Sequence, residues 1–138
     1  TGAGWHLHEE LQWIKDSMVL GHSDYHLRHE TIVYGWTSGG GRASWYGDRT
    51  GTSVFEVPRP KRSADHPTSK PVELVQAMLS NSTRPGDAVY EPFSGSGTTL
   101  MACEVLGRQA LATDIDPRYV QVAIERWQAF TGREAVRV

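Results

Sequence analysis

Residues Asp87–Asp116 read DAVYEPFSGSGTTLMACEVLGRQALATDID, and this stretch decides the fold that we predict. A short apolar run at 88–90 is followed by a turn rich in glycine and serine at 92–97. A helical pattern then occupies 98–106, and a second apolar run occupies 110–112. Strand, glycine turn, helix and strand in this order are typical of a parallel α/β fold that holds a nucleoside cofactor. We therefore expect an α/β fold with its ligand at the glycine turn.

The residues around Gly95 and Gly97 restrict the classes of ligand that the turn can bind. These glycines let a ligand approach the backbone, and the amides that open the next helix favour an anionic group. Asp114 follows Gly95 by 19 residues, where a carboxylate can accept both ribose hydroxyl protons. A phosphate-binding loop would have a lysine where Thr98 stands, and the third glycine of a dinucleotide site is missing. S-adenosylmethionine, a nucleoside that carries a carboxylate, fits these features, and a purely structural tight turn is the alternative.

Composition sets the class of protein. A chain of 138 residues with 38% hydrophobic and 22% charged residues suits one soluble globular domain. No apolar run approaches the roughly 20 residues of a membrane span. The single cysteine, Cys103, permits no disulfide inside the chain, so we expect a buried thiol and a cytoplasmic protein. Because the first residue is Thr1, we expect a processed sequence or part of a longer one.

The first 36 residues are rich in aromatic side chains and histidine. We predict strands at 11–14 and 31–36, adjacent in one sheet, with a loop at 21–24 between them. Five of the six histidines lie in this part of the chain: His6, His8, His22, His26 and His29. Their spacing is not that of a zinc helix, and no cysteine or carboxylate cluster completes a site. Hydrogen-bonding histidines, without a metal, are the expectation that we prefer.

Residues 37–65 form a long segment with little regular pattern, apart from a brief strand predicted at 54–57. Basic residues are interleaved here with aromatic ones, a pattern that suits a nucleic-acid backbone and exposed bases. The net charge of −2 gives no overall attraction to DNA, so such a surface depends on local clustering. The alternative is an ordinary solvated loop. The candidates for DNA contact are Arg42, Trp45, Arg49, Arg59, Lys61 and Arg62.

Two further helices are predicted on either side of the central stretch. Pro71 can open a helix that extends to about Ser82. Asp116 is a suitable N-cap for another helix, which Gly132 ends. The tail at 135–138 could start a third strand.

Several motifs together resemble the β class of DNA amino-methyltransferases, which methylate adenine N6 or cytosine N4. EPFSGSGTT at 91–99 resembles the DPFxGSGTT cofactor motif of that family, and HPTSKPVEL at 66–74 resembles its HPTxKPxEL segment. ATDIDPRY at 112–119 is similar to the family's G-x-E-x-D-P-x-Y strand end. WIK at 13–15 and HETIVYG at 29–35 resemble its WxK and HExIxYG stretches. The resemblance covers roughly residues 10–132 in five ordered motifs.

This resemblance implies a Rossmann-like, S-adenosylmethionine-dependent methyltransferase fold, permuted and incomplete. It implies one domain over 1–138, in which 37–65 occupies the place of the DNA-recognition region. Glu91 stands where the family usually has Asp, and Asp114 where it often has Glu, so both charges are kept. The residues expected to bind the cofactor are Thr68, Ser69, Lys70, Glu91, Phe93, Ser94, Gly95, Ser96, Gly97, Thr98 and Asp114.

The catalytic DPPY tetrapeptide of the family is absent, because none of the seven prolines forms a Pro-Pro pair. In the family this tetrapeptide accepts hydrogen bonds from the target amino group and stacks on a flipped base. We therefore assign no catalytic residue, and we expect activity only if a preceding segment or another chain supplies the motif. A non-catalytic module that binds DNA or a partner is the alternative. A nicotinamide-dependent oxidoreductase is disfavoured by the missing third glycine.

Overall fold

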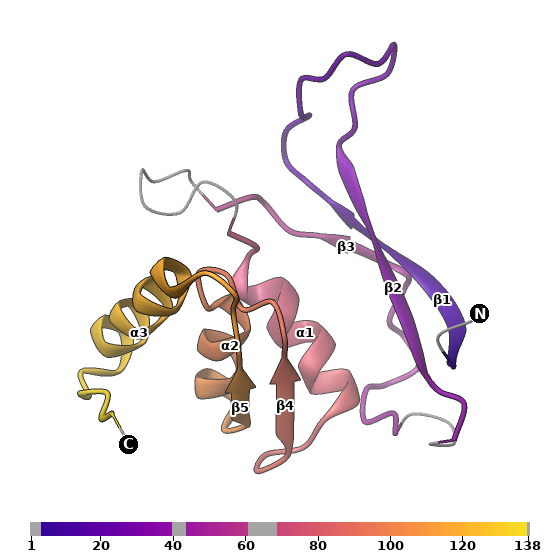
Figure 1. The fold of residues 1–138 in the computed structure, drawn as a ribbon. Coiled ribbons are helices and arrows are strands. Elements are labelled where there is room, and N and C mark those ends of the chain that lie inside the picture. The colour runs from indigo at the N-terminus through magenta and orange to yellow at the C-terminus, as the bar shows by residue number, and fades with distance from the viewer. Residues whose placement is uncertain (1–3, 40–43, 61–68, 138) are drawn as a thin grey trace. The chain divides into compact units, whose positions relative to one another are not determined.

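A computed structural model describes residues 4–39, 44–60 and 69–137 (Figure 1). The chain divides into two compact units, Thr1–Arg59 and Pro60–Val138. The arrangement of both as a single domain stays a prediction.

The first unit is a three-stranded sheet in the order β2-β1-β3. β1 (Trp5–Ile14) pairs antiparallel with β2 (His29–Thr37) and parallel with β3 (Val54–Glu56). The predicted adjacency of two N-terminal strands is confirmed, as is the brief strand near residue 54. β1 begins six residues earlier than predicted, because its exposed first half is held by pairing with the end of β2 rather than by burial of its own side chains.

The pairing of β1 with β2 is irregular at one point. Leu7 lies opposite Gly35 and Glu9 opposite Tyr34, so His8 is an extra residue in a β-bulge. The two backbones approach closely here: a Cβ atom on Gly35 would lie 2.2 Å from the carbonyl oxygen of His6. Only glycine therefore fits at position 35.

The second unit contains two parallel strands and three helices. Its elements in chain order are α1 (Val72–Ser82), β4 (Ala88–Glu91), α2 (Thr98–Leu106), β5 (Gln109–Ala112) and α3 (Pro117–Thr131). β4 and β5 are direct neighbours, and α2 is the crossover between them, packed against α1 and α3. The predicted strand–turn–helix–strand order is confirmed, and α2 has the predicted bounds.

The caps predicted for α3 are confirmed. The Asp116 side chain accepts a hydrogen bond from the Arg118 backbone, Pro117 is the first helical residue, and Gly132 ends the helix at a positive φ of 69°. The predicted strand at 135–138 is wrong for residues 135–137, which are irregular. The backbone nitrogen of Ala135 instead donates to Gln128 Oε1 at 2.8 Å, which folds the tail back onto α3.

The core of this unit is centred on α2, where Met101, Ala102 and Cys103 are buried together with Leu74 of α1. The prediction that Cys103 is a buried thiol is confirmed, and burial raises its pKa. On the sheet, paired Tyr90 and Leu111 remain 66% and 59% exposed. Within the described residues of this unit, one face of the two-stranded sheet is covered and the face with Tyr90 and Leu111 is exposed. None of the described helices combines the length and apolar character that a membrane crossing needs.

Candidate functional site

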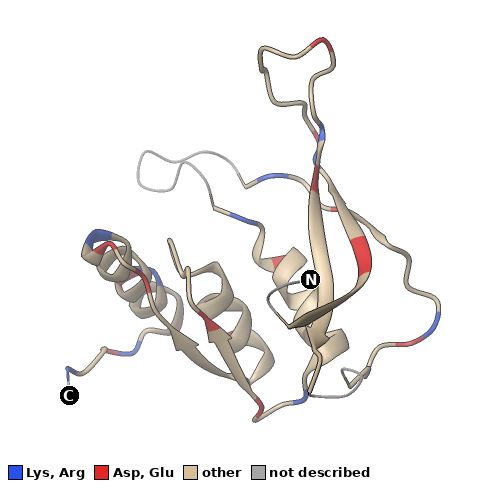
Figure 2. Cartoon of the chain, turned by 45° about the vertical axis from the view of Figure 1, so that its right-hand side comes forward, with Lys and Arg blue, Asp and Glu red and all other residues tan. Residues whose placement is uncertain are grey.

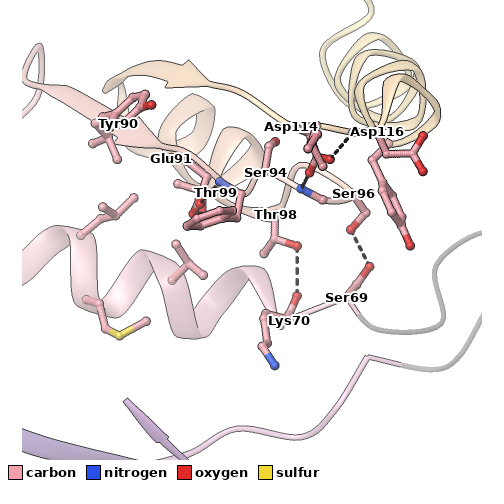
Figure 3. A pocket seen from close by; sticks show the side chains of 18 residues that line it. Ser69, Lys70, Tyr90, Glu91, Ser94, Ser96, Thr98, Thr99, Asp114 and Asp116 are labelled. Atoms are coloured by element: carbon pink, nitrogen blue, oxygen red, sulfur yellow. Dashed lines mark hydrogen bonds between the residues drawn. The ribbon is translucent and has the colours of Figure 1, made fainter. Parts of the chain in front are cut away.

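A pocket of about 840 Å³ lies in the second unit, where β4 and β5 end (Figure 3). Open α/β sheets bind ligands at the carboxyl ends of their strands, so this is the position that the fold provides for a site. The pocket brings together most of the residues predicted to bind a cofactor: Ser69, Lys70, Glu91, Phe93, Ser94, Gly95, Ser96, Thr98 and Asp114. Gly97 is not part of the lining, and Thr68 lies outside the described residues.

The two glycines of the turn have different tasks. Gly97 (φ 81°) directly precedes α2, and a Cβ atom there would lie 2.8 Å from the Cβ atom of Ala123 in α3. Gly95 (φ 52°) has no atom within 4 Å of the place where its Cβ atom would stand. Gly97 therefore permits a helix to pack against the turn, whereas Gly95 leaves open space in front of the backbone.

Asp114 joins the end of β5 to the glycine turn by hydrogen bonds. Its Oδ2 accepts a hydrogen bond from the backbone nitrogen of Gly95 at 2.7 Å, and its Oδ1 accepts one from the backbone nitrogen of Asp116 at 2.9 Å (Figure 3). An ionised carboxylate has about four acceptor positions, so two hydrogen bonds leave capacity for a ligand. Asp114 can thus hold a diol while it also shapes the turn.

Glu91 has a similar position at the end of β4. Its Oε1 accepts from the backbone nitrogen of Phe93 at 2.9 Å, and its Oε2 accepts from Thr99 Oγ1 at 3.1 Å. These bonds join the strand to the turn and to the first turn of α2. Glu91 therefore supports the glycine turn as well as lining the pocket.

Two serines close another wall of the pocket. Ser69 Oγ lies 2.7 Å from Ser96 Oγ, and the Lys70 carbonyl accepts from Thr98 Oγ1 at 3.4 Å (Figure 3). The segment before α1 is thereby joined to the glycine turn, although the two are far apart in sequence.

Arg126 is a residue of this region that the sequence analysis missed. Its Nη1 donates to the Ser96 carbonyl at 2.6 Å and to Ser96 Oγ at 2.9 Å. The guanidinium is partly buried, and burial lowers its pKa. The available signal was its spacing, because Arg126 follows Ala123 by three residues and so shares the helix face that packs against the turn.

Polar and apolar residues also line the rim of the pocket after β5. Ile115 is fully exposed, and Asp116 and Tyr119 follow it at the start of α3. The side chain of Arg118 donates hydrogen bonds to Asp116, at 2.6 Å for the shortest, and these hold the pKa of Asp116 below its ordinary value. Asp116 is therefore ionised at neutral pH and paired with the Arg118 guanidinium.

Of the six predicted DNA contacts, the three that the structure describes, Trp45, Arg49 and Arg59, do not form one cluster. Trp45 and Arg49 line a second cavity, of about 650 Å³, in the first unit. Arg59 is elsewhere in that unit, where its backbone nitrogen donates to Asp16 Oδ1 at 3.0 Å. Figure 2 shows the lysines and arginines dispersed along the chain. The other three candidates, Arg42, Lys61 and Arg62, lie outside the described residues.

The histidines make local contacts in the first unit. His26 Nδ1 accepts from the backbone nitrogen of Gly21 at 3.4 Å, and the rings of His6 and His8 lie against Trp36, with centroids at 4.9 and 4.8 Å. Within 4–39, 44–60 and 69–137, no three side chains of His, Cys, Asp or Glu come together as a metal site would require.

Comparisons with known proteins agree with this geometry. A sequence model described as DNA methylase matches residues 1–125. The type II methyltransferase M.XycI of Xanthomonas campestris pv. cyanopsidis is 31% identical over 136 residues, which cover 91% of this chain and 45% of the relative. The DNA adenine methyltransferase YhdJ of Escherichia coli strain K12 is 33% identical over 78 residues, or 54% of this chain and 26% of the relative. The chain spans less than half the length of these relatives.

Solved structures show the same fold. The crystal structure of the M1.HpyAVI-SAM complex has a TM-score of 0.75 at 25% identity, and the match covers 91% of this chain and 64% of that one. The PvuII DNA methyltransferase (cytosine-N4-specific) has a TM-score of 0.70 at 19% identity, covering 90% and 52%. The predicted Rossmann-like α/β fold is confirmed by these likenesses.

Proposed function

This chain belongs to the N6/N4 DNA methylase family, and from that premise we propose that it is the donor-binding part of a DNA methyltransferase. The enzyme would transfer a methyl group from S-adenosylmethionine to the exocyclic amino group of adenine (N6) or cytosine (N4). Its partner is DNA, and its expected location is the cytoplasm. Relatives named as type II methyltransferases support a role in restriction-modification.

The pairing of Asp114 with Gly95 is the observation that carries this proposal. It puts a carboxylate with spare acceptor capacity beside a glycine that faces open space, within a pocket of about 840 Å³. That volume is in the range of small-molecule sites, roughly 300–1,000 Å³. The amides at the start of α2 suit the carboxylate of the methionine part, and Asp114 suits the ribose hydroxyls. The residues present therefore fit S-adenosylmethionine.

The apolar rim suits the remaining part of the cofactor. Ile115 follows Asp114 directly and is fully exposed, so a flat adenine ring against it would bury apolar surface on both sides. Phe93 on the turn is 86% exposed, so its ring also offers apolar surface to the cofactor. When bound, the cofactor supplies an electrophilic methyl group on sulfur. The task of this chain is to bind and orient that donor and to keep the turn in shape.

We propose that the group that prepares the acceptor comes from outside these 138 residues. The sequence contains no Pro-Pro pair and hence no DPPY-like tetrapeptide. Such a motif accepts hydrogen bonds from the target amino group and stacks on the flipped base. A preceding segment or a separate chain that carries this motif would complete the enzyme.

Isothermal titration of the chain with S-adenosylmethionine and S-adenosylhomocysteine tests donor binding. We expect one saturable site for each, and no heat with either compound would refute the proposal. Transfer of a labelled methyl group to DNA tests the second part. We expect none from the chain alone and recovery on adding a family segment that contains the tetrapeptide. Transfer by the chain alone would show that its own residues prepare the acceptor.

A further inference from the structure

The second cavity of the first unit, about 650 Å³, is not explained by donor binding. One wall comes from the β-bulge of β1. Neighbouring residues of a regular strand point to opposite faces, but a bulge re-aims a side chain. His8 and Glu9 are adjacent in sequence, and both line this cavity. The bulge thus brings an imidazole and a carboxylate to the same site.

The same wall is aromatic. The His8 ring lies 4.8 Å from the Trp36 ring and 6.0 Å from the Tyr34 ring, centroid to centroid, and Tyr34 and Trp36 are 6.4 Å apart. These rings pack together on the paired ends of β1 and β2. They offer flat, polarisable surface to a flat ligand.

The remaining lining residues come from the segment between β2 and β3. Trp45 is 46% exposed, and its Nε1 donates to the carbonyl of Asp48 at 3.1 Å. Asp48 Oδ1 in turn accepts from Thr50, from the backbone nitrogen at 2.9 Å and from Oγ1 at 2.8 Å, and these bonds lower the pKa of Asp48. The segment is therefore held in a defined turn that presents Trp45 and Arg49 to the cavity.

Two charged side chains of the cavity are free to bind a ligand. In the described part of the chain, neither the Glu9 carboxylate nor the Arg49 guanidinium makes a hydrogen bond or an ion pair. A carboxylate accepts two parallel N–H bonds, and a guanidinium donates two parallel bonds to neighbouring acceptors. The lining holds two carboxylates, Glu9 and Asp48, and one guanidinium, Arg49, and the Asp48 carboxylate is engaged by Thr50, so Glu9 and Arg49 offer one acceptor and one donor group to a ligand. A neutral, flat ring with both donors and acceptors on its edges is the chemistry that fits.

We propose that this cavity binds an unpaired guanine base of DNA, with Trp36 and Trp45 against the ring, Glu9 on its donor edge and Arg49 on its acceptor edge. Guanine presents two donors together, N1–H and the N2 amino group, and two acceptors together, O6 and N7. Adenine, cytosine and thymine lack that combination of a two-donor edge and a two-acceptor edge. This inference rests on the proposed function insofar as DNA is the ligand.

The test measures fluorescence anisotropy of labelled single-stranded oligodeoxythymidine that carries one central dG, dA or dC, against the all-dT strand, at one salt concentration. We expect the dG strand to bind at least about fivefold more tightly than the others. Trp45→Ala should weaken binding of every strand, because stacking does not depend on the base. Equal binding of all four strands, or preference for another base, would overturn the assignment.

Glu9→Gln and Arg49→Gln should each remove most of the preference for dG. Both positions are exposed, so neither variant should disturb folding, which circular dichroism checks. Glu10→Gln is the matched control, because Glu10 is the next residue of β1 and does not line the cavity. If Glu9→Gln behaves as Glu10→Gln does, the guanine site is refuted. A titration with S-adenosylmethionine on the same samples separates the two proposals: donor binding without dG preference refutes only the guanine site, and dG preference without donor binding refutes only the proposed function.

Discussion

The Oδ2 atom of Asp114 lies 2.7 Å from the backbone nitrogen of Gly95, which joins the end of β5 to the turn that follows β4. The Asp114 carboxylate is placed to bind a ligand. It also determines the shape of the loop on which that ligand would lie. Binding and local structure are therefore coupled at this position.

Asp114→Ala should lower the affinity for S-adenosylmethionine by about tenfold to a hundredfold, because it removes a charged hydrogen-bond acceptor from both the ligand and the Gly95 amide. Isothermal titration measures the affinity. Asp87→Ala is a matched control, since Asp87 Oδ2 also accepts a backbone amide in a turn, that of Arg84 at 2.8 Å, but it does not line the pocket. Equal affinity for the two variants would contradict a ligand role for Asp114.

Gly97→Ala should destabilise the second unit by more than the cost of placing alanine in a left-handed backbone conformation. A left-handed residue that is not glycine costs about 1–2 kcal/mol, and the contact with Ala123 adds roughly 1–3 kcal/mol of overpacking. Gly107→Ala is the control, because Gly107 (φ 68°) is also left-handed but has no atom within 4 Å of its Cβ position. Urea unfolding should give Gly97→Ala a lower free energy of unfolding than Gly107→Ala. The reverse order would contradict close packing between Gly97 and Ala123.

Arg126→Met should loosen the glycine turn and weaken donor binding, although Arg126 does not line the pocket. It removes two hydrogen bonds to Ser96, together worth about 1–2 kcal/mol of stability at a partly exposed site. Arg126→Lys should recover part of the donor affinity, since an ammonium can still donate to the Ser96 carbonyl. A purely packing role for the side chain predicts no difference between Met and Lys in titrations with S-adenosylmethionine.

The sequence predicted those features whose signals are local. The bounds of α2 follow from the glycines on both sides, and the start of α3 follows from Asp116 and Pro117. The first half of β1 was missed because its exposed residues form a strand only when paired with β2. Arg126 was missed for the same reason: its role depends on Ser96, which is 30 residues away in the sequence.

Asp116→Asn should lower stability at neutral pH, and the difference from the unchanged protein should disappear in acid. The hydrogen bonds from Arg118 hold the pKa of Asp116 below its ordinary value of 3.8. A carboxyl group whose pKa is lowered on folding stabilises the folded state above its unfolded pKa. This contribution is lost as the pH falls from about 3.8 through the lower folded pKa. Asparagine keeps the helix cap, so the variant isolates the charge. Thermal unfolding of both proteins across this pH range is the measurement, and a difference that persists at pH 2 would contradict the assignment.

Lys15 and Glu30 form an ion pair in which one side chain is much more buried than the other. Substituting either residue should therefore lower stability by a different amount. The Lys15 Nζ atom lies 2.6 Å from Glu30 Oε1, and Lys15 is 6% exposed whereas Glu30 is 38% exposed. Glu30→Gln leaves a buried ammonium without its counter-charge and should cost about 1–3 kcal/mol. Lys15→Met should cost less, because methionine keeps much of the apolar stem and water can reach the carboxylate that remains.

The double variant Lys15→Met with Glu30→Gln should be more stable than Glu30→Gln alone, since it no longer buries an unpaired charge. Urea unfolding followed by circular dichroism compares the three variants. If Lys15→Met proves as costly as Glu30→Gln, the pair contributes by mutual attraction and the burial of the ammonium is not the dominant cost.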